Sequence, residues 1–198
     1  QFRKMGVAWV FESEQQAAAV ERQMILAGAS VVGVYSVDST PYIPTEQGIG
    51  HLYLLHHSQF PQSAFCIMPQ QSFKSSPRAS FDKGFDFILP KLASGLKSDT
   101  SGKFEVAGSE LALRDFRVRI GTATQTTQTK GVIVEVEYAP CCLASQAFPM
   151  LNEFIEMFFS SGNIKKPEVL SKKEPEPYGA LETLYQYCLI LSEMRQRA

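Results

Sequence analysis

The sequence predicts an α+β fold, an antiparallel β-barrel of about eight strands with three to four flanking helices. Segments rich in β-branched and aromatic residues follow one another at short spacing, which favours antiparallel neighbours. Helical periodicity is confined to a few separate segments. A closed barrel is the economical arrangement for so many strands, because closure leaves no exposed strand edge.

The first fifty residues are expected to form a strand, a helix and a second strand. The β-rich stretch MGVAWVF at 5–11 is typical of a strand. Ser13 followed by Gln16 gives a capping-box pattern, which predicts that a helix starts there. A second β-rich stretch covers 29–39, and the two prolines and two glycines of 40–50 predict a loop.

The next segment is expected to hold two strands and a short helix. Residues 51–58 and 63–68 have strand composition, with a turn between them. Residues 69–80 are polar and loop-like, with room for one short strand. A helix should begin near Leu89, because Pro90 fits a helix only in its first turn.

Two long β-rich segments then precede a helix. They cover 103–125 and 130–140, and the alternation in the first one changes phase at residues 114–115, which predicts a β-bulge or a break. Helical spacing of large apolar residues follows, with Ser145 as a candidate cap and Gly162 as the expected end.

One domain is expected over residues 5–198, with a C-terminal helix from about residue 178. Residues 162–177 carry three prolines and several lysines and are expected to be an internal polar tether. The natural start is expected at Met5, with residues 1–4 as added sequence.

Composition excludes several functional classes. The 198 residues have a formal net charge of -1, which offers no electrostatic footprint for direct nucleic-acid binding. No apolar run approaches the ~20 residues that a membrane helix needs, so no membrane partner is expected. The four cysteines form no Cys-x-x-Cys pair and are expected to be reduced thiols, as in an intracellular protein.

Glu135 and Glu137 lie two residues apart in a β-branched run and so project from one face of a strand. A hairpin centred on Thr127 would place Arg119 opposite Glu135 and Arg117 opposite Glu137. We predict this structural charge ladder, in which each opposite-charge pair contributes roughly 0.2–1 kcal/mol. A slip of one residue would set charged groups against apolar ones, so the pattern specifies the register.

A metal site is the alternative interpretation of Glu135 and Glu137. A Glu-x-Glu pair on a barrel strand, facing arginines, resembles the lumen of triphosphate tunnel metalloenzymes, in which such glutamates hold a divalent cation. Hard cations do prefer carboxylate oxygens. The enzyme motif continues with a lysine, however, where this chain has Ala139. On this alternative the chain is a divalent-metal-dependent triphosphatase; otherwise we expect no catalytic residue, cofactor or metal.

The adjacent histidines His56 and His57 do not predict a metal site. His56 and His57 are neighbours in a predicted strand, so they face opposite ways and cannot chelate one ion together.

Four ordered segments resemble one known family. They are GVIVEVEYAPC at 131–141 with the aromatic-rich helix after it, MGVAWVF at 5–11, HLYLLHHSQFPQSAFCI at 51–67 and YGALETLYQYCLILSEMRQ at 178–196. Together they are similar to the Mediator complex subunit 20 family, the TBP-related subunit of the Mediator head module.

That resemblance implies a β-barrel with flanking helices and a non-catalytic role in coupling regulators to RNA polymerase II. It implies a heterodimer with Mediator subunit 18, tethered through the C-terminal segment of Mediator subunit 8. It also implies a nuclear location. The family offers no catalytic residues to carry over, and the residues of the partner interface are left unassigned.

Overall fold

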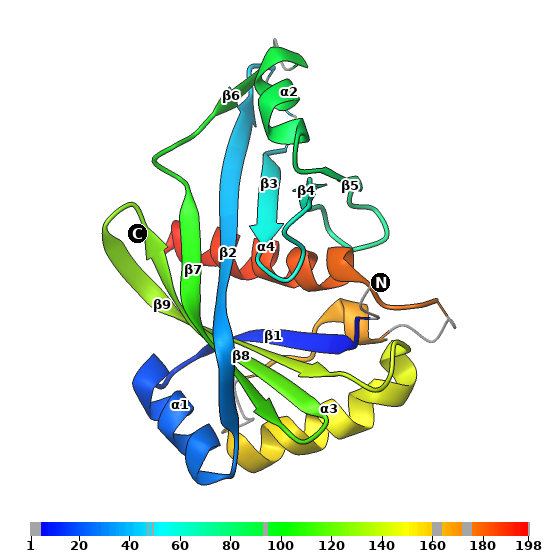
Figure 1. The fold of residues 1–198 in the computed structure, drawn as a ribbon. Coiled ribbons are helices and arrows are strands. Elements are labelled where there is room, and N and C mark those ends of the chain that lie inside the picture. The colour runs from blue at the N-terminus through cyan, green and yellow to red at the C-terminus, as the bar shows by residue number, and fades with distance from the viewer. Residues whose placement is uncertain are drawn as a thin grey trace.

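The computed structural model contains nine strands and four α-helices in the part of the chain that it describes (Figure 1). That part comprises residues 5–46, 48, 50–92, 95–159, 164–171 and 176–197. Residues 1–4, expected to be added sequence, lie outside it. The strands are β1 (Val7–Ser13), β2 (Ser30–Pro44), β3 (Leu52–His57), β4 (Ser63–Ile67), β5 (Arg78–Asp82), β6 (Leu96–Ser98), β7 (Phe104–Leu113), β8 (Phe116–Gln125) and β9 (Gln128–Tyr138). The helices are α1 (Ala17–Leu26), α2 (Phe85–Leu92), α3 (Ala144–Phe158), the 3-10 helix η2 (Glu168–Ser171) and α4 (Ala180–Gln196).

The strands form a single antiparallel sheet, which confirms the predicted α+β class. Their order is β1-β9-β8-β7-β2-β3-β4-β5, and β6 pairs with β2. The predicted barrel is only approximate, because within the described residues β1 and β5 do not pair and the sheet stays open.

The first edge of the sheet is covered by a helix rather than by another strand. The Val10 amide donates to Gln186 Oε1 at 2.9 Å, and Gln186 Nε2 donates to the Ala8 carbonyl at 3.0 Å. One side chain of α4 thus satisfies one N–H and one C=O that barrel closure would have paired.

Helices cover both faces of the curved sheet. α1 contacts β7 and β8, and α3 contacts β1 and β9, on one face. α4 contacts β1, β3, β4 and β5 on the other, and crosses behind β2 and β3 in Figure 1. Trp9 is 3% exposed and stacks on Phe148 of α3, with ring centroids 5.8 Å apart. Among the described residues, no helix has the length and hydropathy that crossing a bilayer requires.

Strand β2 is longer than predicted, since it runs through the expected loop to Pro44. Pairing with β7 ends at Ser39, and pairing with β6 begins at Tyr42. Pro41 lies in the gap between them, where the ladder needs no N–H, and its carbonyl accepts a 2.9 Å bond from the Asp99 amide. A proline is therefore tolerated inside a long strand at this point.

The predicted helix starts are displaced. Ser13 ends β1, and its Oγ accepts a bond from the Gln15 amide instead of capping α1, whose N-cap is Gln16. α2 begins at Phe85, four residues before the predicted start, because amides of its first turn bond to the Lys83 and Gly84 carbonyls. Pro90 then falls near the end of the helix.

Two irregular segments also have explanations. The phase change at residues 114–115 is a hairpin turn between β7 and β8, with Arg114 at φ 53°. The expected polar tether over 162–177 is partly wrong, since Val169 and Leu170 of η2 are buried in the core. Residues 162, 163 and 172–175 of that tether lie outside the described residues.

Candidate functional site

The β8–β9 hairpin has the register that the sequence predicts. Arg119 is the partner of Glu135, and Arg117 is the partner of Glu137. Directly paired residues share one face of a sheet, so all four side chains belong to the face that α4 covers near β1. The glutamates are 0% and 4% exposed, and Arg119 is 1% exposed.

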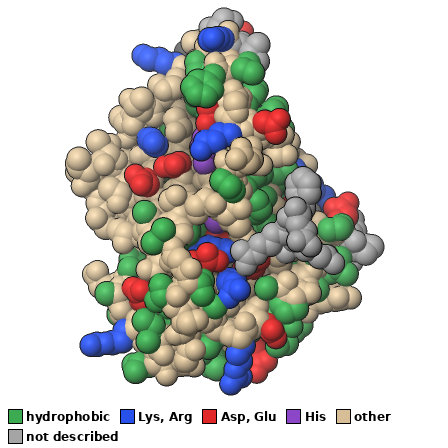
Figure 2. All heavy atoms as spheres, in the orientation of Figure 1, with side chains coloured by type: hydrophobic (Ala, Val, Ile, Leu, Met, Phe, Trp, Pro, Cys, Tyr) green, Lys and Arg blue, Asp and Glu red, His purple; other side chains and the backbone are tan. Residues whose placement is uncertain are grey.

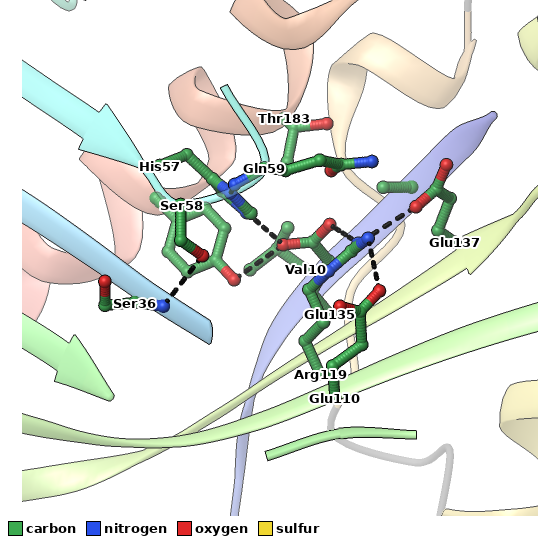
Figure 3. A network of polar contacts seen from close by, with 12 residues as sticks. Val10, Ser36, His57, Ser58, Gln59, Glu110, Arg119, Glu135, Glu137 and Thr183 are labelled. Carbon is green, nitrogen blue, oxygen red and sulfur yellow. Dashed lines mark hydrogen bonds and ion pairs between the residues drawn. The ribbon is translucent and has the colours of Figure 1, made fainter. Parts of the chain in front are cut away.

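Arg119 holds three carboxylates at the centre of this face (Figure 3). Its Nη1 donates to Glu135 Oε1 at 2.6 Å and to Glu137 Oε2 at 2.9 Å. Its Nη2 donates to Glu110 Oε1 of β7 at 3.0 Å. The remaining oxygen of Glu137 accepts the Gly6 amide at 2.9 Å, which ties the chain before β1 to the same network.

Glu135 also joins β3 and α4 through its second oxygen. Oε2 accepts a 2.7 Å bond from the Tyr187 hydroxyl and lies 3.1 Å from His57 Nε2. The Gln59 amide donates to His57 Nδ1 at 3.0 Å, so Nδ1 is an acceptor and the proton is on Nε2. His57 is therefore a neutral donor to Glu135 in this arrangement.

The electrostatics favour an ionised Glu135. Burial alone would raise the pKa of its carboxyl, but Arg119, with His57 and Tyr187, lowers that pKa to about 2. Burial would likewise lower the pKa of Arg119, and the three carboxylates raise it above its usual value instead. Burial and the neighbouring Glu135 carboxylate raise the pKa of the Tyr187 hydroxyl, so it stays a donor.

The predicted ladder is uneven. Arg119 makes every ion pair of the hairpin, whereas Arg117 is half-buried and has no carboxylate within 4.0 Å among the described residues. That these four residues act only structurally stays a prediction.

The arrangement does not fit the metal alternative. The guanidinium of Arg119 lies between Glu135 and Glu137, where a tunnel enzyme would place its cation, and the other oxygens of both carboxylates already accept hydrogen bonds. In the described part of the chain, no three His, Cys, Asp or Glu side chains are placed to hold a metal ion. A divalent cation there would have to displace an internal salt bridge.

Three members of the network could not be predicted from the sequence. They are Glu110, His57 and Tyr187, none of which has a sequence pattern that points to the Glu135–Arg119 pair. His57 is 78 residues from Glu135, and Tyr187 is 52 residues from it. His56 faces away from His57, as predicted, and its Nε2 lies 3.0 Å from Asp86. The four cysteines are free thiols.

Comparison with known proteins identifies relatives over nearly the whole chain. The family model described as "TATA-binding related factor (TRF) of subunit 20 of Mediator complex" matches residues 5–192. A Caenorhabditis briggsae protein, "Mediator of RNA polymerase II transcription subunit 20", is 44% identical over 98% of this chain and 100% of its own length. The human protein of the same name is 29% identical over 98% of this chain and 92% of its own.

Among solved structures, the fold is similar to the PH1012 protein from Pyrococcus horikoshii OT3. The TM-score is 0.53 with 10% sequence identity, over 88% of this chain and 97% of the other. At that identity the likeness concerns the fold alone.

Proposed function

Because this chain belongs to the Mediator subunit 20 family, we propose that it is a non-catalytic subunit of the Mediator coactivator, in its head module. It acts by protein–protein contact, coupling regulators to RNA polymerase II transcription. The family match across residues 5–192 is the observation that carries this proposal.

The site geometry supports an architectural role. The carboxylates on the α4-covered face are engaged by Arg119, His57 and Tyr187 from within the chain. Removing one member of such a buried network leaves its partners uncompensated and is costly, and carboxylates engaged from within the chain leave no open position for a substrate. The triphosphatase alternative is accordingly not favoured.

The proposed partners are Mediator subunit 18, as a heterodimer, and the C-terminal segment of Mediator subunit 8, as the tether to the head module. The proposed location is the nucleus. Family membership supports these assignments, because the relatives are named as subunits of Mediator.

Affinity purification of the tagged chain from nuclear extract tests the proposal. We expect subunits 18 and 8 in near-stoichiometric amounts by mass spectrometry, and their loss when an excess of untagged chain competes. A reciprocal purification through subunit 18 is the control for the tag. Recovery of the chain as a stable monomer, without either subunit, would contradict the proposal.

A further inference from the structure

Among the described residues, about half of strand β2 has a partner strand on one side only. The edge segment, residues 30–35 of β2, pairs with β7 except at Val32, where the register shifts between Val31 and Gly33. On the other side, β3 pairs with β2 only from Val37 to Tyr42. Figure 1 shows β3 beside the upper half of β2, while the lower half continues towards α1. The sheet therefore has a step, at which an internal strand becomes an edge strand.

The backbone groups of Val34 point to the side of β2 on which the described residues place no strand. Where β3 ends, the Ser58 amide donates to the Ser36 carbonyl at 2.9 Å, and the Ser36 amide donates to Ser58 Oγ at 3.0 Å. Alternate residues of a strand direct their N–H and C=O to the same side. Val34 thus directs its backbone groups the same way as Ser36, beyond the end of β3.

The other two edges of the sheet are protected. Gln186 of α4 hydrogen-bonds to the backbone of β1 at Ala8 and Val10. β5 is five residues long and carries Arg78 and Asp82 at its ends. Short length and charge are common protections against edge-to-edge pairing. The edge segment carries no charge, and its one irregularity is the β-bulge between Val31 and Gly33, which leaves residues 33–35 regular.

The three valine side chains of the edge segment are exposed, whereas Tyr35 is buried. Val31, Val32 and Val34 are 54%, 52% and 85% exposed, and Leu26 at the end of α1 is 82% exposed. Figure 2 shows hydrophobic side chains interspersed with charged ones over the lower part of the molecule, where β2 and α1 lie. No charged residue occurs from Ala29 to Val37. A shallow hollow beside Val34 is lined only by uncharged residues, namely Val34, Tyr35, Ser36, Ser58, Ala107, Gly108 and Ser109.

We propose that the edge segment binds an extended segment of a partner protein, which adds a strand to the sheet beside β2. Main-chain hydrogen bonds supply the affinity in this mode of recognition, and side-chain pockets supply the specificity. The occupant is uncharged and rich in β-branched residues, since it faces valines and no charge. The occupant belongs to the assembly that this chain joins, so the inference rests on the proposed function.

Amide hydrogen exchange on Mediator purified through the tagged chain, compared with the isolated chain, tests this directly. We expect exchange of the Val34 amide to slow at least tenfold in the assembly. The amides of Gly33 and Tyr35, on residues that alternate with Val34, are the internal references and should change little. Equal exchange of the Val34 amide in both samples would overturn the inference.

Two variants of Val34 separate backbone pairing from side-chain packing. Val34→Pro removes the outward N–H while leaving the β7 ladder intact, and Gly33 before it accommodates the ring. Val34→Thr keeps the N–H and is the matched control. We expect Val34→Pro to reduce co-purification of at least one Mediator subunit at least tenfold, with the melting temperature of the isolated chain within a few degrees of the parent. Val34→Thr should co-purify that subunit at the parent level.

The failures are distinguishable. If Val34→Pro recovers every subunit at the parent level, the inference is wrong and the proposed function stands. If the parent chain recovers no Mediator subunit, the proposed function is wrong, and so is the inference that a Mediator subunit binds the edge segment. If the isolated parent dimerises by light scattering and Val34→Pro does not, the occupant is a second copy of the chain instead.

Discussion

The Tyr187 hydroxyl donates a 2.7 Å hydrogen bond to Glu135, joining the last helix to a strand 52 residues earlier in the chain. Both side chains are fully buried. Tyr187→Phe should lower the free energy of unfolding by about 1.5–3 kcal/mol, as expected for a lost hydrogen bond to a charged group. Urea denaturation measures this. Tyr53→Phe is the control, since no hydrogen bond of the Tyr53 hydroxyl is found among the described residues; equal losses in both variants would contradict the prediction.

Arg119 and Arg117 provide a matched pair on one strand. Arg119→Met leaves three carboxylates without their cation and should cost about 3–5 kcal/mol of stability, as for a broken buried ion pair. Arg117→Met removes a half-buried side chain that has no ion pair in the described structure, and should cost less than about 1 kcal/mol. Thermal and urea unfolding of the two variants measure the difference. Similar losses of stability in the two variants would contradict the prediction, because they would mean that Arg117 stabilises the fold as much as Arg119 does.

Stability should depend on acid pH through Glu135. Its pKa is about 2 in the folded protein against an ordinary 4.5. The unfolded chain therefore takes up the proton first, so stability is complete above about pH 4.5 and falls as the pH drops towards 2. The loss from this group is roughly 3 kcal/mol over that window.

Glu135→Gln should flatten this part of the profile, measured by urea unfolding at a series of pH values. Asp99→Asn is the control: a hydrogen bond from Ser101 lowers the pKa of Asp99, but this carboxylate is close to the surface, and its removal should change the slope far less. An unchanged acid slope in Glu135→Gln would contradict the assignment.

Divalent cations should not bind between Glu135 and Glu137. We expect millimolar Mn²⁺ or Mg²⁺ to leave the melting temperature unchanged, because the Arg119 guanidinium occupies that position. A saturable rise, together with triphosphate hydrolysis that Glu135→Ala abolishes, would restore the metal alternative.

The register of the β8–β9 hairpin could be predicted because the residues that specify it lie in two strands that are adjacent in the sequence. Charged and β-branched residues alternate on both strands, and only one register pairs Arg119 with Glu135 while pairing Val118 with Val136. The fold class could be predicted for a similar reason, since each strand and helix carries its own periodicity. What could not be predicted depends on contacts between residues far apart in sequence.

His57 and Gln186 illustrate that limit. Nothing in the alternation of β3 shows that His57 faces Glu135, because the contact depends on how strongly the sheet curves. The prediction of a barrel assumes that strand edges need closing, but backbone groups at an edge can also be satisfied by an amide side chain, as Gln186 does for Ala8 and Val10 of β1. A glutamine in an apolar helix gives no sign of that role.

The contact of Gln186 with β1 also constrains the order of events during synthesis. The ribosome makes β1 early, yet the side chain that covers its outer edge arrives 176 residues after Val10. Until then, the Ala8 carbonyl and the Val10 amide of β1 lack their bonds to Gln186 while the other strands are being made. Such late, long-range closure slows folding and leaves partly built sheets open to aggregation. Chaperones or an early-binding partner would therefore matter most for this chain before its last helix is complete.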